Sequence, residues 1–413
     1  MRKTALLLVT LAAAVAAQAQ SGFALKNGDR VVFYGDSITD NAWYPKFVEL
    51  FIRLRYPDLD VRFYNAGVGG DRVTGGWMGP IDDRMTRDLF SRKPTVVTVM
   101  LGMNDGGYQA PKDEITNAYH AGYQHMIDRL KKETPRARVF LIKPSPFDDV
   151  TRAPGWPGGY NGVMKSFGDY VDGLAKTNGY ASVDFNAPVV SMLEKANASD
   201  AGTAQKIIPD RVHPGSAGHM VMAEQLLLGW GALPVVANVN IDVRTTRVFG
   251  LHSKVADVAL AGKISWTQID DGLPFPLDRK DPQVALTLKS GDFDQKLNQE
   301  MLTVKNLDPG TYTLNIDGKA VASFSADELG AGVNLAMYET PMLAQARNVW
   351  GAVTQRVDAM YNTWRQLEVG MAWVTSPKRD AAIKDMNDLS DELIGLARNG
   401  AKPVKHTFEL VRQ

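Results

Sequence analysis

Four short segments of the chain contain residue types that together can transfer an acyl group. The segments are GDSIT at 35–39, NAGVGGD at 65–71, GMND at 102–105 and DRVH at 210–213. A serine hydroxyl is a weak nucleophile that needs a base beside it, and the carbonyl under attack needs hydrogen-bond donors around its oxygen. Because the segments supply a hydroxyl, an imidazole and several amide groups, the sequence predicts an ester-cleaving site if the fold brings them together.

The elements that must position these segments alternate along the chain from Asp29 to about Pro234. Short apolar runs, separated by helix-length stretches, lie at 31–34, 61–64, 95–101, 139–142 and 181–183. Runs of this kind are typical of parallel strands buried on both faces under helices. Ligands bind beyond the carboxyl ends of such strands. Since 35–37, 65–70 and 102–105 directly follow the first three runs, we expect them to converge on one edge of the sheet.

The four segments resemble the signature of the SGNH/GDSL hydrolase family, and the resemblance covers roughly residues 29–230. The counterparts are GDS at Gly35, Asp36 and Ser37, NxGxxG at Asn65, Gly67 and Gly70, GxND at Gly102, Asn104 and Asp105, and DxxH at Asp210 and His213. The resemblance implies a flavodoxin-like, three-layer α/β/α fold and a serine ester hydrolase that needs no cofactor.

The resemblance also implies a role for each residue of the site. Ser37 is the expected nucleophile and His213 the general base, with Asp210 orienting the imidazole ring. The expected oxyanion hole consists of the backbone N–H groups of Ser37 and Gly70 and the side-chain amide of Asn104. The DxxH spacing fits these roles because one short loop can place both side chains. Gly70 is expected to be glycine because a side chain there would crowd the approaching carbonyl.

Several of these residues have a purely structural alternative. Ser37 can cap the helix that leads toward Tyr44, the glycines at 67–70 can form a turn, and Asn104 can form an Asx turn with its neighbour. His213 can be an ordinary loop histidine.

The residues next to the motifs have expected structural roles. The competing base His219 is expected to face the core side of the following helix. Asp36 and Asp105 are expected to brace their loops rather than carry protons.

Aromatic residues near the expected cleft indicate the substrate class. They are Trp43, Trp77, Tyr108, Trp156 and Tyr160, several of them in loops rich in glycine and proline. Loop aromatics with polar edges suit stacking on sugar rings, whereas a long acyl chain needs an apolar tunnel or lid. Trp77, Tyr108, Trp156 and Tyr160 are therefore the predicted substrate contacts, although some can simply pin their loops.

These observations favour a carbohydrate O-acetylesterase that acts on a polysaccharide or oligosaccharide. The alternatives are a lipase, lysophospholipase or thioesterase of the same family, an acyltransferase, and a catalytically silent glycan-binding protein.

The composition narrows the possible partners. Basic and acidic residues balance at 46 each, without a basic stripe, which disfavours a nucleic-acid partner. Cysteine is absent, which excludes disulfides and thiolate nucleophiles. None of the six histidines has metal-ligand spacing, so the sequence calls for no metal.

The N-terminus has the features of an export signal. Arg2 and Lys3 precede an apolar run from Ala5 to Ala17, and cleavage is expected after Ala19. The sequence thus predicts a signal peptide at 1–19 and a secreted or periplasmic protein. The alternative, an uncleaved anchor, is less favoured because the run is shorter than the ~20 residues that span a bilayer. No other segment is long and apolar enough to span a membrane.

Two further regions follow the hydrolase domain, which we place at 20–235. Alternating apolar residues and the turn Asp317-Gly318 predict a β-rich accessory module at 236–335. Residues 336–413 are expected to form a helical hairpin, with helix starts at Thr340-Pro341 and Ser376-Pro377. Its apolar stripes are Ala346, Trp350, Val353, Val357, Met360, Trp364 and Leu367 in the first helix, and Ile383, Met386, Leu389, Leu393 and Leu396 in the second. The stripes can cover the β module or a second subunit, so a dimer through these helices stays open.

Overall fold

The computed structural model describes residues 22–413, and its first part is built on a five-stranded parallel sheet. The strands are β1 (Arg30–Gly35), β2 (Arg62–Gly67), β5 (Val96–Met100), β6 (Arg138–Lys143) and β7 (Ala181–Asp184), in the order β2-β1-β5-β6-β7. Gly35 is level with Gly67 on one side and Met100 on the other. The loops after these three strands therefore begin at the same edge. The predicted signal peptide, residues 1–19, lies outside the described residues.

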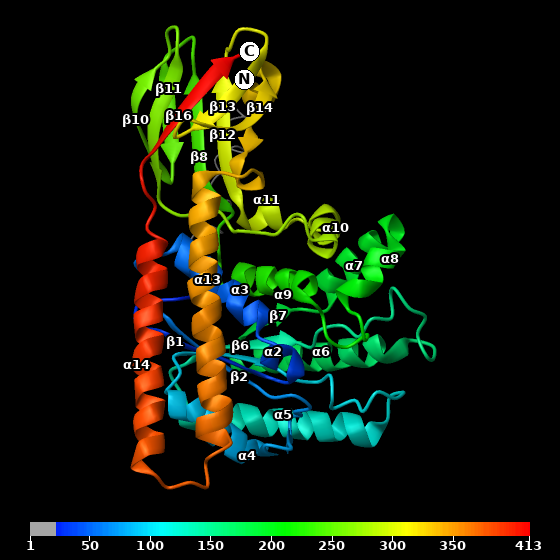
Figure 1. Ribbon diagram of the computed structural model, residues 1–413. Helices are drawn as coiled ribbons and strands as arrows, with labels where there is room; N and C mark the ends of the chain where they lie inside the picture. The colour runs from blue at the N-terminus through cyan, green and yellow to red at the C-terminus, as the bar shows by residue number, and fades with distance from the viewer. Residues whose placement is uncertain (1–21) are drawn as a thin grey trace, which may run out of the picture.

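Helices cover both faces of this sheet (Figure 1). The longer ones are α3 (Trp43–Arg55), α5 (Asp113–Glu133), α6 (Gly159–Asn178), α7 (Ala187–Ser199) and α9 (Ser216–Gly229). Short elements lie between them: α2 (Ser37–Asp40), β3 (Gly75–Gly76), β4 (Gly79–Pro80), α4 (Ile81–Arg84), the π-helix η1 (Met85–Leu89), η2 (Phe90–Arg92) and α8 (Ala201–Ile207). In β1, residues 31–34 are all at most 1% exposed, which explains the continuous apolar run. The predicted flavodoxin-like fold is confirmed.

A β module follows, and one of its strands comes from residues 406–412, outside the range 236–335 predicted for the module. The module has two sheets, β10-β11-β16-β13-β14 and β15-β12-β8-β9. Its strands are β8 (Val235–Asp242), β9 (Arg247–Leu251), β10 (Ser253–Ala259), β11 (Ile264–Asp270), β12 (Gln299–Lys305), β13 (Thr311–Ile316), β14 (Lys319–Ser325), β15 (Val333–Asn334) and β16 (His406–Arg412). The short elements α10 (Pro282–Ser290), α11 (Phe293–Leu297), α12 (Ala326–Ala331) and η3 (Leu335–Met337) accompany them.

The strand β16 returns from the end of the chain to lie between β11 and β13. It does so because its alternate residues Phe408 and Leu410 are buried, at 1% and 3% exposure. Residues 336–413 are thus not helical throughout.

The helical hairpin consists of α13 (Pro341–Asn362), its π-helical continuation η4 (Thr363–Val369) and α14 (Pro377–Gly400). Figure 1 shows both helices running antiparallel along the α/β part. Trp350 of α13 stacks on Phe47 of α3, with ring centroids 5.5 Å apart. The first apolar stripe therefore covers the α/β part of the same chain, instead of the β module or a second subunit.

The second helix of the hairpin differs from the predicted stripe. Leu389 and Leu396 are 41% and 63% exposed, whereas Ser390, Ile394 and Ala397 are buried. The small side chains of Ser390 and Ala397 let the two helices approach closely, so the buried face is shifted by one residue from the leucines.

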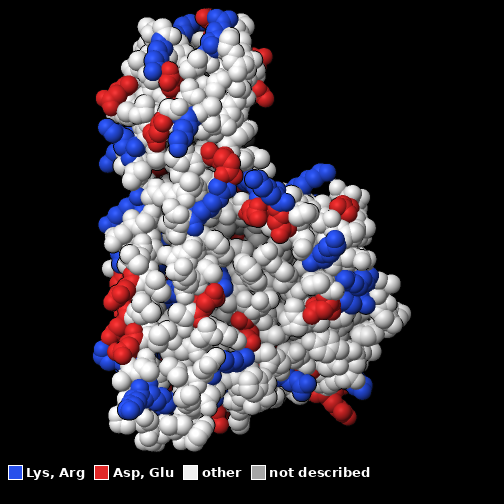
Figure 2. Space-filling model, in the orientation of Figure 1, with Lys and Arg blue, Asp and Glu red and all other residues white. Residues whose placement is uncertain are grey.

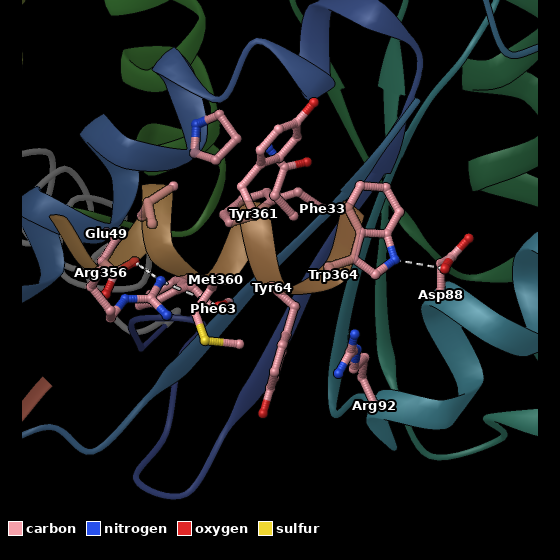
Figure 3. A pocket seen from close by; sticks show the side chains of 13 residues that line it. Phe33, Glu49, Phe63, Tyr64, Asp88, Arg92, Arg356, Met360, Tyr361 and Trp364 are labelled. Carbon is pink, nitrogen blue, oxygen red and sulfur yellow. Dashed lines mark hydrogen bonds and ion pairs between the residues drawn. The ribbon is translucent and has the colours of Figure 1, made fainter. Parts of the chain in front are cut away.

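The hairpin interface also contains buried polar contacts, shown in Figure 3. Arg356 forms an ion pair with Glu49 of α3, and both side chains are at most 5% exposed. The Trp364 indole N–H donates to Asp88 at 2.8 Å. Buried charges need such partners, so these contacts fix the position of the hairpin on the α/β part.

The surface of the described residues carries mixed charge. Figure 2 shows basic and acidic side chains interspersed over the visible face. None of the helices within residues 22–413 combines the length and hydropathy needed to cross a membrane.

Candidate active site

The serine of the first motif lies at the start of the short helix α2, directly after strand β1. Asp36, not Ser37, is the N-cap of this helix: its carboxylate accepts the N–H of Ile38 at 3.0 Å. The capping alternative for Ser37 is therefore wrong. Because Asp36 satisfies the helix start, the Ser37 hydroxyl is left available at the sheet edge.

A continuous hydrogen-bonded chain joins Ser37 to the DxxH loop. The Nε2 atom of His213 is 2.8 Å from Ser37 Oγ, and its Nδ1 atom is 2.6 Å from Asp210 Oδ2. Partial burial favours a raised pKa for Asp210, but the hydrogen bonds from His213 and Val212 outweigh it and lower the pKa below its usual value. An ionised carboxylate only accepts hydrogen bonds, so Nδ1 carries the proton and Nε2 is free to accept from Ser37.

Arg211 holds the DxxH loop in place, and no role for this residue is predicted from the sequence. Its φ of +74° lies in the left-handed region, which a non-glycine residue adopts only when contacts compensate. The guanidinium pairs with Asp149 at 2.5 Å and lies 4.7 Å from the Phe147 ring centroid. Arg211 fills one of the variable positions of DxxH, so the motif gave no signal for it.

The three predicted donors lie on the loops that leave the sheet edge. Gly70 has φ +78°, and a Cβ there would meet nothing within 4 Å. The positive φ alone therefore favours glycine at position 70, since no neighbouring protein atom would clash with a side chain there. Within residues 22–413, the N–H groups of Ser37 and Gly70 have no hydrogen-bond acceptor.

Asn104 is fixed by two contacts. Its amide nitrogen donates to the Asp71 carbonyl at 3.0 Å, and its oxygen accepts from the Tyr108 hydroxyl at 3.1 Å. A side-chain amide has two N–H hydrogens, so one remains for a ligand.

The rest of the NxGxxG block braces helix α2. Asn65 donates to the Thr39 carbonyl at 2.8 Å and accepts the N–H of Gly67 at 2.9 Å. A Cβ at Gly67 would lie 2.2 Å from the Asp40 backbone nitrogen. Glycine at this position therefore allows β2 to pack directly against the helix that carries Ser37.

Two buried carboxyl groups flank the site. Burial raises the pKa of Asp36 and of Asp105 to about 7 in each case. Asp105 accepts the N–H of Val73 at 2.9 Å, as Asp36 accepts that of Ile38. These contacts confirm that both residues brace their loops, whereas the raised pKa values mean that both carboxyl groups hold a proton below about pH 7.

The competing histidine faces the core, as expected. His219 is fully buried and its Nδ1 accepts the N–H of Tyr44 at 3.3 Å. Burial lowers its pKa to about 3, so the ring is neutral.

The structure separates the predicted substrate-contact aromatics. Tyr160 is 1% exposed and its hydroxyl donates to the Met103 carbonyl at 2.6 Å. It belongs to the core because α6 begins at Gly159, so its prediction as a substrate contact is wrong.

The other aromatic residues differ in exposure. Trp156 packs edge-on against Tyr160, with ring centroids 6.4 Å apart. Tyr108 and Trp77 remain accessible at 45% and 70% exposure. Trp43 stacks with Trp350 of the hairpin.

A pocket of about 430 Å³ opens beside the serine and the histidine. Its lining is Ser37, Asp40, Asn41, Ala42, Lys46, His213, Asp358 and Tyr361. Asp358 and Tyr361 come from α13, and Asp358 pairs with Lys46 at 2.7 Å. This pocket wall could not be predicted from the apolar stripe of α13, because a helical stripe does not indicate which surface it will cover. Across residues 22–413, no group of three or more His, Asp and Glu side chains is arranged to hold a metal ion.

Known proteins resemble this chain over two different lengths. Residues 33–221 match the GDSL-like lipase/acylhydrolase family. An acetylxylan esterase from Geobacillus stearothermophilus is 26% identical over 225 residues, which cover 49% of this chain and 93% of that protein. A solved structure of Axe2, an acetylxylan esterase from the same organism, is 24% identical, covers 50% of this chain and 96% of its own, and has a TM-score of 0.41.

The full length of the chain also has a structural relative. A gut microbial diltiazem-metabolizing enzyme is 27% identical, with a TM-score of 0.83, and the match covers 96% of this chain and 100% of that one. Taken with the family match and the four motifs on one sheet edge, these similarities show that the chain contains a domain of the SGNH/GDSL hydrolase family and is a serine ester hydrolase.

Proposed function

We propose that the enzyme removes acetyl groups from hydroxyl groups of a carbohydrate through an acyl-enzyme on Ser37. The observation that carries the proposal is the hydrogen-bonded chain from Asp210 through His213 to the Ser37 hydroxyl, which ends at a polar pocket. Such a chain activates a serine that is otherwise a weak nucleophile.

The reaction follows from the positions of these groups. As Ser37 Oγ attacks the ester carbonyl, His213 Nε2 takes its proton and the carboxylate of Asp210 stabilises the imidazolium. The carbonyl oxygen becomes an oxyanion, which the N–H groups of Ser37 and Gly70 and the Asn104 amide can bind. His213 then gives the proton to the departing alkoxide, leaving acetyl-Ser37. A water molecule then attacks the acetyl carbonyl as His213 takes one of its protons. The second tetrahedral intermediate collapses with cleavage of the bond to Ser37 Oγ, His213 returns the proton to Oγ, and acetic acid is released.

The lining of the pocket supports a small acyl group and a polar alcohol. Lys46, Asn41 and Asp358 present charged or amide groups beside Ser37, and Tyr361 adds an aromatic ring with a polar edge. Hydroxyl-rich leaving groups match such a lining, whereas a long acyl chain needs apolar surface. The similarity to an acetylxylan esterase supports the same substrate class.

The proposal is tested by acetate release from acetylated xylans, pectins and chitooligosaccharides, with diltiazem added to the panel because the full-length relative metabolises it. Ser37→Ala is the matched control: we expect an unchanged thermal midpoint and no turnover. A chain-length series of p-nitrophenyl esters should lose activity steeply beyond butyryl. Turnover by Ser37→Ala, or a preference for long acyl chains, would contradict the proposal. A competing sugar acceptor distinguishes hydrolysis from acyl transfer.

We also propose that the protein is exported, on the basis of the basic and apolar residues at 2–17. Mass spectrometry of the protein recovered from its native host should find Gln20 as the first residue, in the periplasm or the medium. An intact N-terminus in the cytosolic fraction would contradict export.

A further inference from the structure

Arg365 of the helical hairpin lies beside the active-site loop at 67–71, which contains Gly69 and Gly70. It belongs to the π-helix η4, and its side chain is 22% exposed. One guanidinium nitrogen is 3.2 Å from Asp40 Oδ2, and the guanidinium carbon lies 5.1 Å from the Trp77 ring centroid. Another nitrogen contacts the sulfur of Met78 at 2.8 Å. Arg365 therefore touches three residues that surround the loop.

The two principal partners of Arg365 hold the same residue of that loop. Asp40 Oδ2 accepts the N–H of Gly69 at 3.2 Å, and the Trp77 indole N–H donates to the Gly69 carbonyl at 2.8 Å. Gly69 directly precedes Gly70, whose N–H is a proposed oxyanion donor. Since Trp77 is 70% exposed, the cation on its ring face is a substantial restraint on where the indole N–H points.

The neighbouring residue Trp364 connects the hairpin to the far end of the same loop. Its indole N–H donates to Asp88, which also pairs with Arg84. Arg84 in turn donates to Asp71 Oδ2 at 2.9 Å. The Asp71 carbonyl accepts from Asn104, the third proposed donor. Trp364 and Arg365 are thus each linked, through intervening side chains, to one end of the segment 69–71.

We propose that Arg365 is a positioning residue for the oxyanion hole. By holding Asp40 and Trp77, it fixes both polar groups of Gly69 and so aims the N–H of Gly70 at the oxygen of the attacked carbonyl. The inference rests on the proposed function of Ser37. Donors must lie within 2.7–3.1 Å of the oxyanion, and a misplacement of about 1 Å can cost about 100-fold in rate.

The test compares Arg365→Gln with the native enzyme on p-nitrophenyl acetate. We expect kcat to fall about tenfold while KM changes less than about twofold, because the defect affects the oxyanion and not the ground state. The affinity for a boronic acid, which forms a tetrahedral anionic adduct with the serine, should fall by the same factor as kcat. Arg365→Lys keeps a cation near Asp40 and should recover part of both losses.

The matched control is Asp391→Asn. It removes another ion pair between the hairpin and the α/β part, Arg62–Asp391 at 2.9 Å, which touches neither Gly69 nor the pocket. We expect native kcat and boronate affinity. An equal loss in this control would show that Arg365 acts only through hairpin stability and would overturn the proposal.

Two further variants keep the proposal testable if Arg365→Gln does not fold. Trp77→Phe keeps a ring beneath Arg365 but removes the hydrogen bond to the Gly69 carbonyl, so it should lower kcat without raising KM. Asp40→Asn combined with Arg365→Gln should cost less than the sum of the single losses, because both act on one peptide. Unchanged kcat in Trp77→Phe, or full additivity, would overturn the proposal. If Ser37→Ala remains active, the proposed function itself fails, whatever these variants show.

Discussion

The two walls of the active-site pocket are held by different kinds of interaction. On the α/β side, backbone groups fix the side chains: Asp210 Oδ1 accepts the N–H groups of Val212 and His213 at 3.0 and 2.7 Å. On the hairpin side, charged side chains reach across an interface, as in the Lys46–Asp358 and Arg365–Asp40 pairs. Backbone contacts within one short loop restrict geometry more than long side chains do. We therefore expect the largest losses of kcat from changes in the first wall, and smaller losses of kcat together with changes in substrate choice from changes in the second.

The largest expected effect comes from the α/β wall. Asp210→Asn removes the charge that fixes the tautomer of His213, so kcat should fall by up to about 10⁴-fold. Steady-state kinetics on p-nitrophenyl acetate measures the loss. Asp200→Asn is the control, because Asp200 likewise accepts a backbone N–H at 3.1 Å but caps helix α8. Native activity in Asp210→Asn would show that the ring orientation comes from elsewhere.

Removing one donor should cost less than removing the orienting carboxylate. Asn104→Ala deletes a side-chain amide of the proposed oxyanion hole, and kcat should fall about 10²–10³-fold. Tyr108→Phe loses only the hydroxyl that donates to Asn104, so its loss should be much smaller in the same assay. Equal losses would mean that Tyr108 acts on the substrate directly.

The hairpin interface should contribute to stability according to burial. Arg356→Met leaves the carboxylate of Glu49 without one of its two buried cationic partners, and the free energy of unfolding should drop by about 3 kcal/mol. The exposed pair Arg62–Asp391 should contribute less than about 1 kcal/mol, as Asp391→Asn would show. Denaturant titration compares the two variants. Similar losses would indicate that the hairpin is held by its exposed contacts as much as by its buried ones.

The buried carboxyl groups make stability depend on pH in a defined direction. Burial raises the folded-state pKa of Asp105 to about 7, above its unfolded value. The folded protein therefore keeps a proton that the unfolded chain releases. This contribution is fully present below the unfolded pKa, near pH 4, and is lost as pH rises toward 7, at about 1.4 kcal/mol per pH unit. Asp105→Asn should flatten this part of the pH profile in thermal unfolding. An unchanged profile would show that Asp105 is ionised in the fold.

The α/β wall could be predicted from the sequence because its determinants are local. The GDS and DxxH motifs each span only three or four residues, so neighbouring residues determine the positions of Ser37 and His213. The loops after parallel strands meet at one edge of the sheet, whatever the arrangement of the covering helices. The prediction of Tyr160 as a substrate contact is wrong because its glycine-rich surroundings resemble a loop, although helix α6 starts there. Asp358, Tyr361 and Arg365 could not be assigned, since the apolar stripe of α13 shows that a face is buried but not what covers it. The position of β16 could not be predicted either, because it pairs with β11 and β13, which lie far earlier in the chain.

The smallest expected effect is a change in KM caused by a substitution in the hairpin wall, and it tests directly whether this wall selects the substrate. Asp358 is 56% exposed and pairs with Lys46 at the pocket, so Asp358→Asn should leave folding and the kcat for p-nitrophenyl acetate unchanged. A single polar contact contributes about 0.5–1.5 kcal/mol, so KM for an acetylated oligosaccharide should rise about twofold to tenfold. Steady-state kinetics on both substrates measures the difference. If KM rises equally for both substrates, the hairpin wall does not select the alcohol, and the expected difference between the two walls is wrong.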